Sequence, residues 1–370
     1  MAHSDVVSVE EDQWTHSPFG GEIHEGMIWG RGAVDTKDLV ASELMIMLLL
    51  KRHDLQPDRD VTMCTFADEE AGSRHGARWM WEKHRELIDA EFAINEGGGS
   101  PIEVAGKRFF AVQCGEKGSA QMRITASAAP GHASMPRDDT AMLRMGKALQ
   151  TLSTHIFPTV MTNSVEGMLR TLAEHLEDNL AADIREILQE PDIENLNRLP
   201  LDDMTLLALR AMTRNTAVPT IIHGGHRINV IPGEIVCDVD GRILPGQDPG
   251  DFRREVAELL GENVHVELTG NPSSGIEADP ESPFFDTIRE VMEGLDDNAT
   301  IAPYLVPGGT DARAVPGIKV YGFKPGYYSE AEMNGAHNHD ERISIDNLAF
   351  STRALFKIVT QFTNVQQAPA

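Results

Sequence analysis

Cysteine is scarce in this sequence: the chain has three cysteines in 370 residues, and none stands in a CxxC pair. Because Cys64, Cys114 and Cys237 are odd in number and widely spaced, they disfavour a disulfide framework and a zinc site built from thiolates. Any metal site in this protein must therefore be built from histidines and carboxylates.

Long apolar runs and positive charge are scarce as well. No apolar run approaches the roughly 20 residues that a membrane span requires, and no charged-then-apolar leader opens the sequence. The 32 Lys and Arg against 58 Asp and Glu leave a formal net charge of −26, which repels phosphate backbones and anionic membranes. We therefore expect a cytoplasmic protein that binds neither nucleic acid nor a membrane.

The chain is organised around residues 61–72, VTMCTFADEEAG, where an alternating apolar run ends in three acids. The alternation predicts a buried strand, and side chains at the carboxyl end of such a strand face the ligand crevice of an α/β sheet. Adjacent glutamates can divide the work there: one binds a divalent metal and the other acts as a general base. The ordinary alternative is that Asp68 caps a helix whose positive N-terminus favours Glu69 and Glu70.

Other histidines and acids stand at the ends of predicted elements. His3 and Asp5 lie two apart on an extended segment, Asp35 precedes an apolar helix over 39–50, and Glu96 follows a short strand over 91–95. Each has an ordinary explanation as well: a frayed terminus, a helix cap and a glycine turn. His337 lies in an HNHDE run before a final helix over 346–362.

Collected, these positions supply two imidazoles and three carboxylates, with Glu69 left over: His3, Asp35, Glu70, Glu96 and His337. Such ligands suit a pair of zinc ions bridged by Asp35, with Glu70 and either histidine completing one site and Glu96 the other. A two-metal site of this kind polarises a carbonyl and supplies hydroxide at neutral pH.

The order of elements predicts an α/β catalytic domain interrupted by a second module. Residues 1–114 and 271–370 carry the α/β pattern, with a helix over 283–295, a glycine turn over 307–313 and a strand over 318–323. Residues 115–270 read as an inserted α+β (βαββαβ) module with strands near 120–126, 220–223, 230–244 and 264–268 and helices near 140–154 and 249–260. Within it, residues 165–214 form a helix-rich, amphipathic insertion.

Seven motifs in this order resemble those of the dinuclear zinc exopeptidases and amidohydrolases, a family that includes acetylornithine deacetylase, succinyl-diaminopimelate desuccinylase, aminoacylase and carboxypeptidase S. The motifs are HSDVV at 3–7, GRGAVD at 30–35, DEEAG at 68–72, NEGG at 95–98, GHAS at 131–134, NVIP at 229–232, and His337 four residues before Glu341. The resemblance covers essentially the whole chain and favours the carboxypeptidase S and aminoacylase branch. Ser8 departs from the family's usual proline, and the family's leading segment does not precede the first motif here.

The resemblance implies a role for each motif. It implies two divalent ions, zinc with cobalt as an alternative, whose ligands are His3, Asp35, Glu70, Glu96 and His337. It also implies that Asp5 supports these ligands from behind. It makes Glu69 the base, while His132 of the inserted dimerisation or lid module reaches the partner's active site in a homodimer and steadies the oxyanion. Asn229 and Arg242 are implied to hold the substrate, and Gly308, Gly309 and Thr310 to line the pocket.

The sequence therefore predicts a metal-dependent hydrolase of an amide bond next to a free carboxylate, either an N-acyl-amino-acid deacylase or a carboxypeptidase or dipeptidase. Water activated by the metals loses a proton to Glu69, attacks the carbonyl, and the proton passes to the leaving amine. The alternative is a catalytically weak or silent metal-binding paralogue, because His3 without a leading segment is expected to fray.

Overall fold

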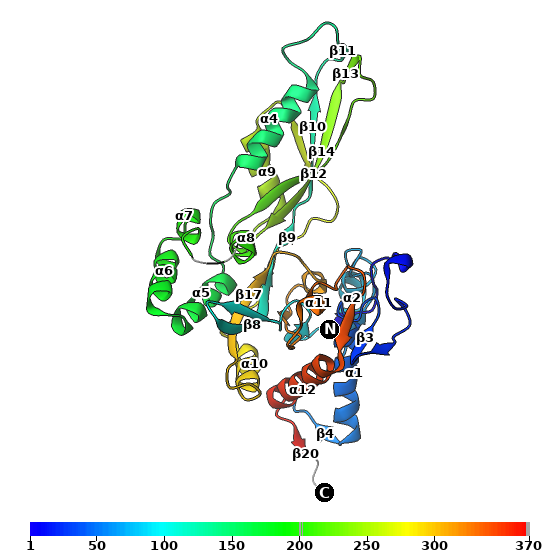
Figure 1. Ribbon diagram of the computed structural model, residues 1–370, viewed down its shortest axis with the longest axis vertical. Coiled ribbons are helices and arrows are strands. Elements are labelled where there is room, and N and C mark those ends of the chain that lie inside the picture. The colour runs from blue at the N-terminus through cyan, green and yellow to red at the C-terminus, as the bar shows by residue number, and fades with distance from the viewer. Residues whose placement is uncertain (200, 202, 368–370) are drawn as a thin grey trace.

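The computed structural model describes residues 1–199, 201 and 203–367, and it divides into a larger α/β part and a projecting sheet with two helices. Figure 1 shows the projecting part at the top and the N-terminus in the larger part below it. None of the described helices is long and apolar enough to cross a membrane. Residues 368–370, the end of the expected last catalytic segment, lie outside the described residues.

The larger part is built on a mixed sheet that contains six strands within the described ranges. Strands β6 (Phe92–Asn95) and β18 (Lys319–Gly322) run parallel, as do β8 (Lys107–Glu116) and β17 (Thr300–Val306). β7 (Pro101–Val104) and β16 (Ile276–Glu277) add to β8 in antiparallel fashion. The expected strands over 91–95 and 318–323 are therefore confirmed, and each is slightly shorter than predicted.

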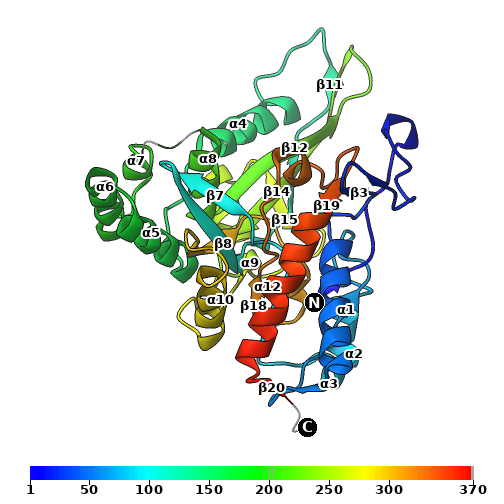
Figure 2. The ribbon, with the colours of Figure 1, turned by 60° about the horizontal axis from the view of Figure 1, so that its bottom comes forward.

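One face of this sheet packs on three helices: α1 (Lys37–Arg52), α10 (Pro283–Glu293) and α12 (Ile345–Phe362). Figure 2 shows α1 and α12 side by side although they come from opposite ends of the chain, and Thr352 Oγ1 lies 3.0 Å from Ser42 Oγ between them. Residues 39–50 are apolar on nearly every face and so predict a buried helix, but helix α1 is buried on one side only, because Leu44 and Met45 are exposed. Its buried stripe is Leu39, Ile46 and Leu50, as expected of a helix at the protein surface.

The opposite face carries the helix-rich insertion. Helices α5 (Asn163–His175), α6 (Asp178–Gln189), α7 (Ile193–Leu196) and α8 (Asp203–Met212) share an apolar core with Val104, Phe109 and Leu305 of the large sheet. Residues 200 and 202 of this insertion lie outside the described residues. The insertion thus packs on the α/β part, although its sequence stands within the expected inserted module.

The projecting part contains a five-stranded antiparallel sheet among the residues that the structure describes. Its main strands are β12 (Thr216–Gly224), β14 (Glu234–Ile243), β10 (Met122–Ser127) and β15 (His265–Leu268), in that order, and β9 (Gly118–Ser119) pairs with β14. Helices α4 (Ala141–Thr154) and α9 (Pro249–Leu260) cover one face through a core that includes Met122, Ile124 and Val256. The strands and helices expected here are confirmed, except that 230–244 is two strands, β13 (Val230–Ile231) and β14.

Short elements complete the chain and carry several of the candidate residues. They are β1 (Ala2–His3), η1 (Glu11–Gln13), β2 (Ile23–His24), β3 (Met27–Trp29), β4 (Leu55–Gln56), β5 (Thr65–Phe66), α2 (Ala77–Lys83), α3 (Arg85–Ile88), β11 (Gly131–His132), η2 (Asp311–Ala314), α11 (Glu330–Met333), β19 (Arg342–Ser344) and β20 (Gln366–Gln367).

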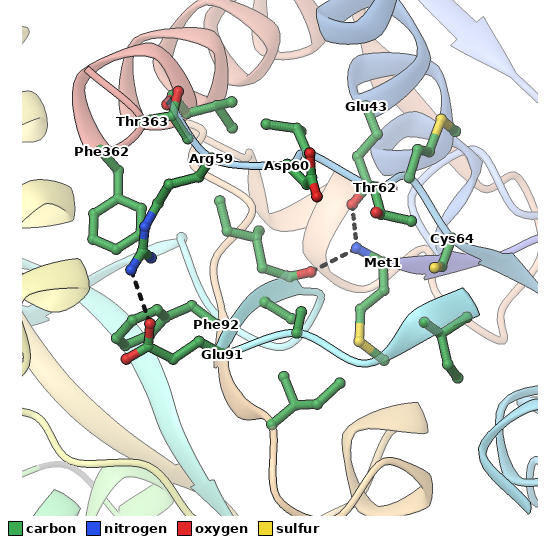
Figure 3. Close-up of a pocket in the computed structure, with 18 of the residues that line it drawn as sticks. Met1, Glu43, Arg59, Asp60, Thr62, Cys64, Glu91, Phe92, Phe362 and Thr363 are labelled. Carbon is green, nitrogen blue, oxygen red and sulfur yellow. Dashed lines mark hydrogen bonds and ion pairs between the residues drawn. The ribbon is translucent and has the colours of Figure 1, made fainter. Parts of the chain in front are cut away.

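The expected strand over 61–67 is reduced to β5, because its parallel partner β1 aligns only Ala2 with Thr65 and His3 with Phe66. The amino group of Met1 is held 2.7 Å from Glu43 Oε1 and 2.7 Å from the Ile94 carbonyl oxygen. Figure 3 shows the Met1 amino group in a cavity, and residues 59–64 line one side of this cavity, whose volume is about 360 Å³. The expectation that His3 lies on a frayed segment is therefore wrong in this structure: His3 is in a strand and 1% exposed.

Candidate metal centre

Asp35 is the carboxylate at which the two predicted histidines meet. Its Oδ1 lies 3.1 Å from His3 Nε2, and its Oδ2 lies 3.1 Å from His337 Nε2. Asp35 does not cap helix α1, because Thr36 is the residue at the cap and no side chain there accepts a capping hydrogen bond. The ordinary explanation of Asp35 as a helix cap is therefore wrong.

Two groups of three ligand-type side chains share Asp35. His3, Asp35 and Glu96 form the first and Asp35, Glu70 and His337 the second, and within each group the ligand atoms all lie within 4.8 Å of one another. Glu96 Oε1 lies 3.4 Å from His3 Nε2, and Glu70 Oε2 lies 2.9 Å from His337 Nε2. The sequence left open which histidine belongs with Glu70, and the geometry pairs Glu70 with His337 and Glu96 with His3.

The clustered carboxylates of the two groups create a negative potential that attracts cations. Burial alone would lower the pKa of His3, but hydrogen bonds with Asp35 and Glu96 outweigh it and raise that pKa to about 11. Burial, and next the charge of Asp35, raises the pKa of Glu70. Imidazole nitrogens and carboxylate oxygens around one shared carboxylate are a donor set that fits a pair of zinc ions.

Asp5 supports both groups at once. The His3 ring directs Nδ1 toward Asp5, 3.0 Å from the carbonyl oxygen and 3.5 Å from Oδ1, which leaves Nε2 facing Asp35. The Asp5 carboxylate also accepts hydrogen bonds from the backbone N–H groups of Glu69, at 3.2 Å, and Glu70, at 3.1 Å. One carboxylate thus orients a candidate ligand and fixes the turn that carries two other site residues.

Glu341 holds the loop of Asp35 from behind, a contact that the sequence did not predict. Its carboxylate is fully buried and accepts hydrogen bonds from the backbone N–H groups of Gly32, Val34 and Asp35, at 2.7 to 3.0 Å. Arg31 Nη1 donates a fourth at 2.9 Å. The sequence signal was present, since an acid four residues after His337 belongs to the last motif, but its partners are more than 300 residues away.

Glu69 belongs to neither group of ligands. It lies in the turn after β5, and helix α2 begins only at Ala77, so the explanation of Glu69 and Glu70 as helix N-terminal residues is wrong. Asp68 instead accepts a hydrogen bond from the His75 backbone N–H at 2.7 Å. Burial, and next the charge of Glu96, raises the pKa of Glu69 to about 8.

The glycine turn after β17 approaches the centre through Thr310. Thr310 Oγ1 accepts a hydrogen bond from Asn95, which precedes Glu96, at 2.7 Å, and the Thr310 backbone N–H donates to buried Glu116 at 2.9 Å. Gly309 packs so closely on the Arg313 guanidinium that a Cβ there would lie 1.9 Å from it. A Cβ at Gly308 would make only an ordinary contact, 3.6 Å from Val306 Cγ1, so its proposed role in lining a pocket draws on the resemblance alone.

Three predicted residues lie in the projecting part. His132 is exposed on β11, where Nδ1 pairs with Ser134 Oγ at 2.7 Å, and Figure 1 shows β11 at the far end of the molecule from α1 and β3. Asn229 is also exposed, and its carbonyl oxygen accepts the Ala133 N–H. Arg242 pairs with Asp240 at 2.9 Å near the base of the sheet. Within one described chain, His132 and Asn229 are not part of the candidate metal centre.

Comparison with known proteins gives a consistent result. A family model described as peptidase family M20/M25/M40 matches residues 1–361. The chain is 25% identical to human N-fatty-acyl-amino acid synthase/hydrolase PM20D1, and the alignment covers 100% of this chain and 74% of that protein. It is 28% identical to probable carboxypeptidase S-like 2 of Dictyostelium discoideum, and that alignment covers 93% of this chain and 67% of that protein. An M20 metallo-carboxypeptidase from Sulfolobus solfataricus shares the fold, with a TM-score of 0.65 and 18% identity over 98% of this chain and 84% of that one.

We expect Glu341→Gln to weaken zinc binding at the groups around Asp35 by roughly 10- to 100-fold, the usual effect of removing a residue that supports a ligand. The amide has one acceptor oxygen where the carboxylate has two, so the three N–H groups of the Asp35 loop lose a partner. Zinc affinity is measured by competition with a chelator.

The matched control is Glu332→Gln. Glu332 is also buried and accepts the Ser344 backbone N–H at 2.8 Å, but it does not contact the Asp35 loop. Both variants should lower the unfolding temperature, and only Glu341→Gln should change zinc affinity. Wild-type affinity in the Glu341→Gln protein would show that the loop keeps its shape without this carboxylate.

Proposed function

Because this chain belongs to peptidase family M20/M25/M40 and is a hydrolase of amide or peptide bonds, we propose that it cleaves an amide bond adjacent to a free carboxylate. The observation that carries the proposal is the pair of ligand groups joined at Asp35, with Glu69 beside them as a carboxylate outside both. A purely structural metal site has no use for such an additional acid. The two candidate reactions are removal of an N-acyl group from an amino acid and removal of a terminal residue from a short peptide.

The proposed ligands of the two divalent ions are His3 and Glu96 on one side, Glu70 and His337 on the other, and Asp35 between them. Zinc is the proposed metal, because borderline imidazole and carboxylate donors suit it, and cobalt is the alternative. When bound, such a pair of ions polarises a carbonyl and makes water acidic enough to react at neutral pH.

In the proposed reaction, a Glu69 carboxylate oxygen accepts a proton from the attacking water as the new carbon–oxygen bond forms. The same oxygen then gives that proton to the amide nitrogen as the carbon–nitrogen bond breaks, so that the products are a carboxylic acid and an amine. Asp5 fixes the backbone of Glu69 during both transfers, because it binds the Glu69 N–H.

The substrate's free carboxylate is proposed to bind Arg242, whose guanidinium can hold both oxygens. Arg242 lies in the projecting part, so binding would join that part to the centre on Asp35. Asn229 is proposed to contact the substrate as well, and Gly308, Gly309 and Thr310 to line the pocket. The relatives named for N-acyl amino acids and for carboxypeptidase S support both classes of substrate.

A homodimer through the projecting part is proposed to complete the site. We take residues 115–270 as the inserted module and 1–114 and 271–370 as the catalytic domain. Strand β12 lies at an edge of its sheet, and Val218, Ile221 and Ile222 on it are about half exposed, as are Met142 and Leu143 of α4. An apolar sheet edge of this kind favours pairing with a second copy, which would bring His132 toward the partner's centre. The three free cysteines fit the reducing cytoplasm.

Glu69→Gln should lower turnover by about 100- to 10,000-fold while zinc content stays at the wild-type level, because Glu69 carries protons and is not a proposed ligand. Turnover is measured on N-acyl amino acids and dipeptides, and zinc by elemental analysis. Glu70→Gln is the control and should lose zinc as well as activity. Near-normal turnover in the Glu69→Gln protein would show that Glu69 is not the general base. A wild-type protein that binds two zinc ions but is inactive would favour the alternative of a catalytically silent paralogue.

Arg242→Ala should weaken the binding of substrates with a free carboxylate far more than that of the corresponding amides or esters. The comparison uses kcat/KM for each matched pair of substrates. Arg123→Ala is the control, because Arg123 pairs with Asp238 on the same sheet at 2.7 Å in an exposed position. If acids and amides lost activity equally, Arg242 would have no part in carboxylate recognition.

His132 should act across the dimer. A mixture of inactive His132→Ala and Glu69→Gln proteins should regain activity once subunits have exchanged, because a hybrid dimer has one centre with both an intact Glu69 and a His132 from the partner. Subunit exchange is followed with two affinity tags. No recovery in verified hybrid dimers would contradict action in trans.

A further inference from the structure

A third group of ligand-type side chains lies outside the centre on Asp35. His16, Glu22 and His24 bring their ligand atoms within 4.8 Å of one another, and they share no residue with the other two groups. Glu22 Oε2 lies 2.8 Å from His24 Nε2 and 4.0 Å from His16 Nδ1. From this geometry we propose that His16, Glu22 and His24 form a separate binding site for one divalent transition metal ion, with zinc as the first candidate.

The donor set fits such an ion. Two imidazoles and one carboxylate are the three protein ligands of many four-coordinate zinc sites in which water takes the last position. The same nitrogen-rich set also binds copper and nickel ions, whereas calcium and magnesium prefer oxygen ligands alone. The three side chains are 26 to 49% exposed, so an ion reaches them directly from solvent.

The backbone around the three ligands is fixed by hydrogen bonds to other elements. Thr15, next to His16, donates from its N–H and its hydroxyl to the two oxygens of Asp340, each at 2.7 Å. The carbonyl oxygen of Glu22 accepts the Trp29 N–H at 2.9 Å, and His24 lies in β2, paired with Met27 of β3. The site therefore needs only side-chain movement to bind an ion, so little backbone entropy opposes binding.

The required movement is a rotation of one imidazole. The rings of His16 and His24 are stacked with centroids 3.7 Å apart and planes 7° apart. A metal ion lies near the plane of each imidazole that binds it, so two parallel rings cannot both direct a nitrogen at one ion. His24 has room to turn, since its side chain is 40% exposed. Opening of this stack is the structural change that binding predicts.

The ion would add a cross-link to a loop that hydrogen bonds to Asp340 already hold near the candidate metal centre. It would link residue 16 to residues 22 and 24, and Thr15 in the same loop binds Asp340, three residues after His337. Among the described residues, the third group contains a single acid, Glu22, which is itself one of the proposed ligands. We therefore assign a structural role to this ion, and the assignment does not depend on the proposed hydrolase activity.

Zinc counting provides the first test. Wild-type protein equilibrated with a small excess of zinc and then separated from unbound metal should hold three zinc ions per chain, and the His16→Ala, His24→Ala double variant should hold two. His84→Ala is the matched control, because His84 also pairs with a glutamate, Glu86, at 3.7 Å and its ring lies 4.8 Å from that of a tryptophan, Trp79. Among the described residues it belongs to no group of three ligands. The control should keep three. The test is the difference of one zinc ion: equal zinc content in the wild type and the double variant would overturn the proposal, whatever the number bound at the groups around Asp35.

Tryptophan fluorescence provides a second test that needs no activity. The Trp29 ring lies 4.6 Å from that of His16, so copper bound at the third site should quench Trp29 emission. Copper added to the zinc-loaded wild type should quench the part of the emission that comes from Trp29, which is the part missing from the Trp29→Phe protein. The double variant should keep this emission. Glu70→Gln, which damages the catalytic centre, should keep this quenching. Equal quenching in the wild type and the double variant would contradict a copper-binding site beside Trp29.

Discussion

The side chain of Asp35 joins parts of the chain that are far apart in sequence. One oxygen faces His3 from the first strand and the other faces His337 from the loop before the last helix. Glu70 and Glu96 approach from two further segments, so three carboxylates and two imidazoles converge within a few ångströms. Unscreened carboxylates at such distances repel each other, and this arrangement requires positive charge between them, from protons or from metal ions.

The supporting contacts show how the protein holds these charges in place. Glu341 accepts the N–H groups on either side of the Asp35 loop, and Lys324 pairs with buried Asp38 at 3.0 Å just beyond it. Asp5 binds the turn of Glu69 and Glu70 in the same way. Each supporting acid binds backbone N–H groups or a buried cation, and in this way it fixes the segments that carry the candidate ligands.

Much of this arrangement was accessible from the sequence because local patterns determine it. The helices 141–154 and 249–260 have regular apolar periods, and the structure places them within one residue of their predicted ends. The acids Glu70 and Glu96 are predictable because each stands within three residues of the end of an apolar segment. The grouping of the five residues in one site was predicted from their residue types together with the family resemblance, since nothing in the local sequence relates His3 to His337.

The features that could not be predicted from the sequence are those that depend on packing between distant segments. Residues 61–63 alternate like a strand, yet a strand exists only where another backbone pairs with it, and β1 pairs with just Thr65 and Phe66. The helices of the insertion look like part of the inserted module, but their apolar faces pack on β8 and β17. Glu341 likewise could not be recognised as the support of Asp35, because its role consists of contacts with a loop 300 residues earlier.

The separation of Glu69 from Glu70 follows from the turn that carries them. Adjacent residues in a strand point to opposite faces, but these two follow Asp68, whose φ of +70° lies in the left-handed region and turns the chain sharply after β5. Asp5 then holds both N–H groups on one side of the turn, which leaves the two side chains free to diverge. Glu70 reaches His337, whereas Glu69 stays outside both ligand groups. The backbone, and not any difference in side-chain chemistry, thus assigns two identical residues to different positions around Asp35.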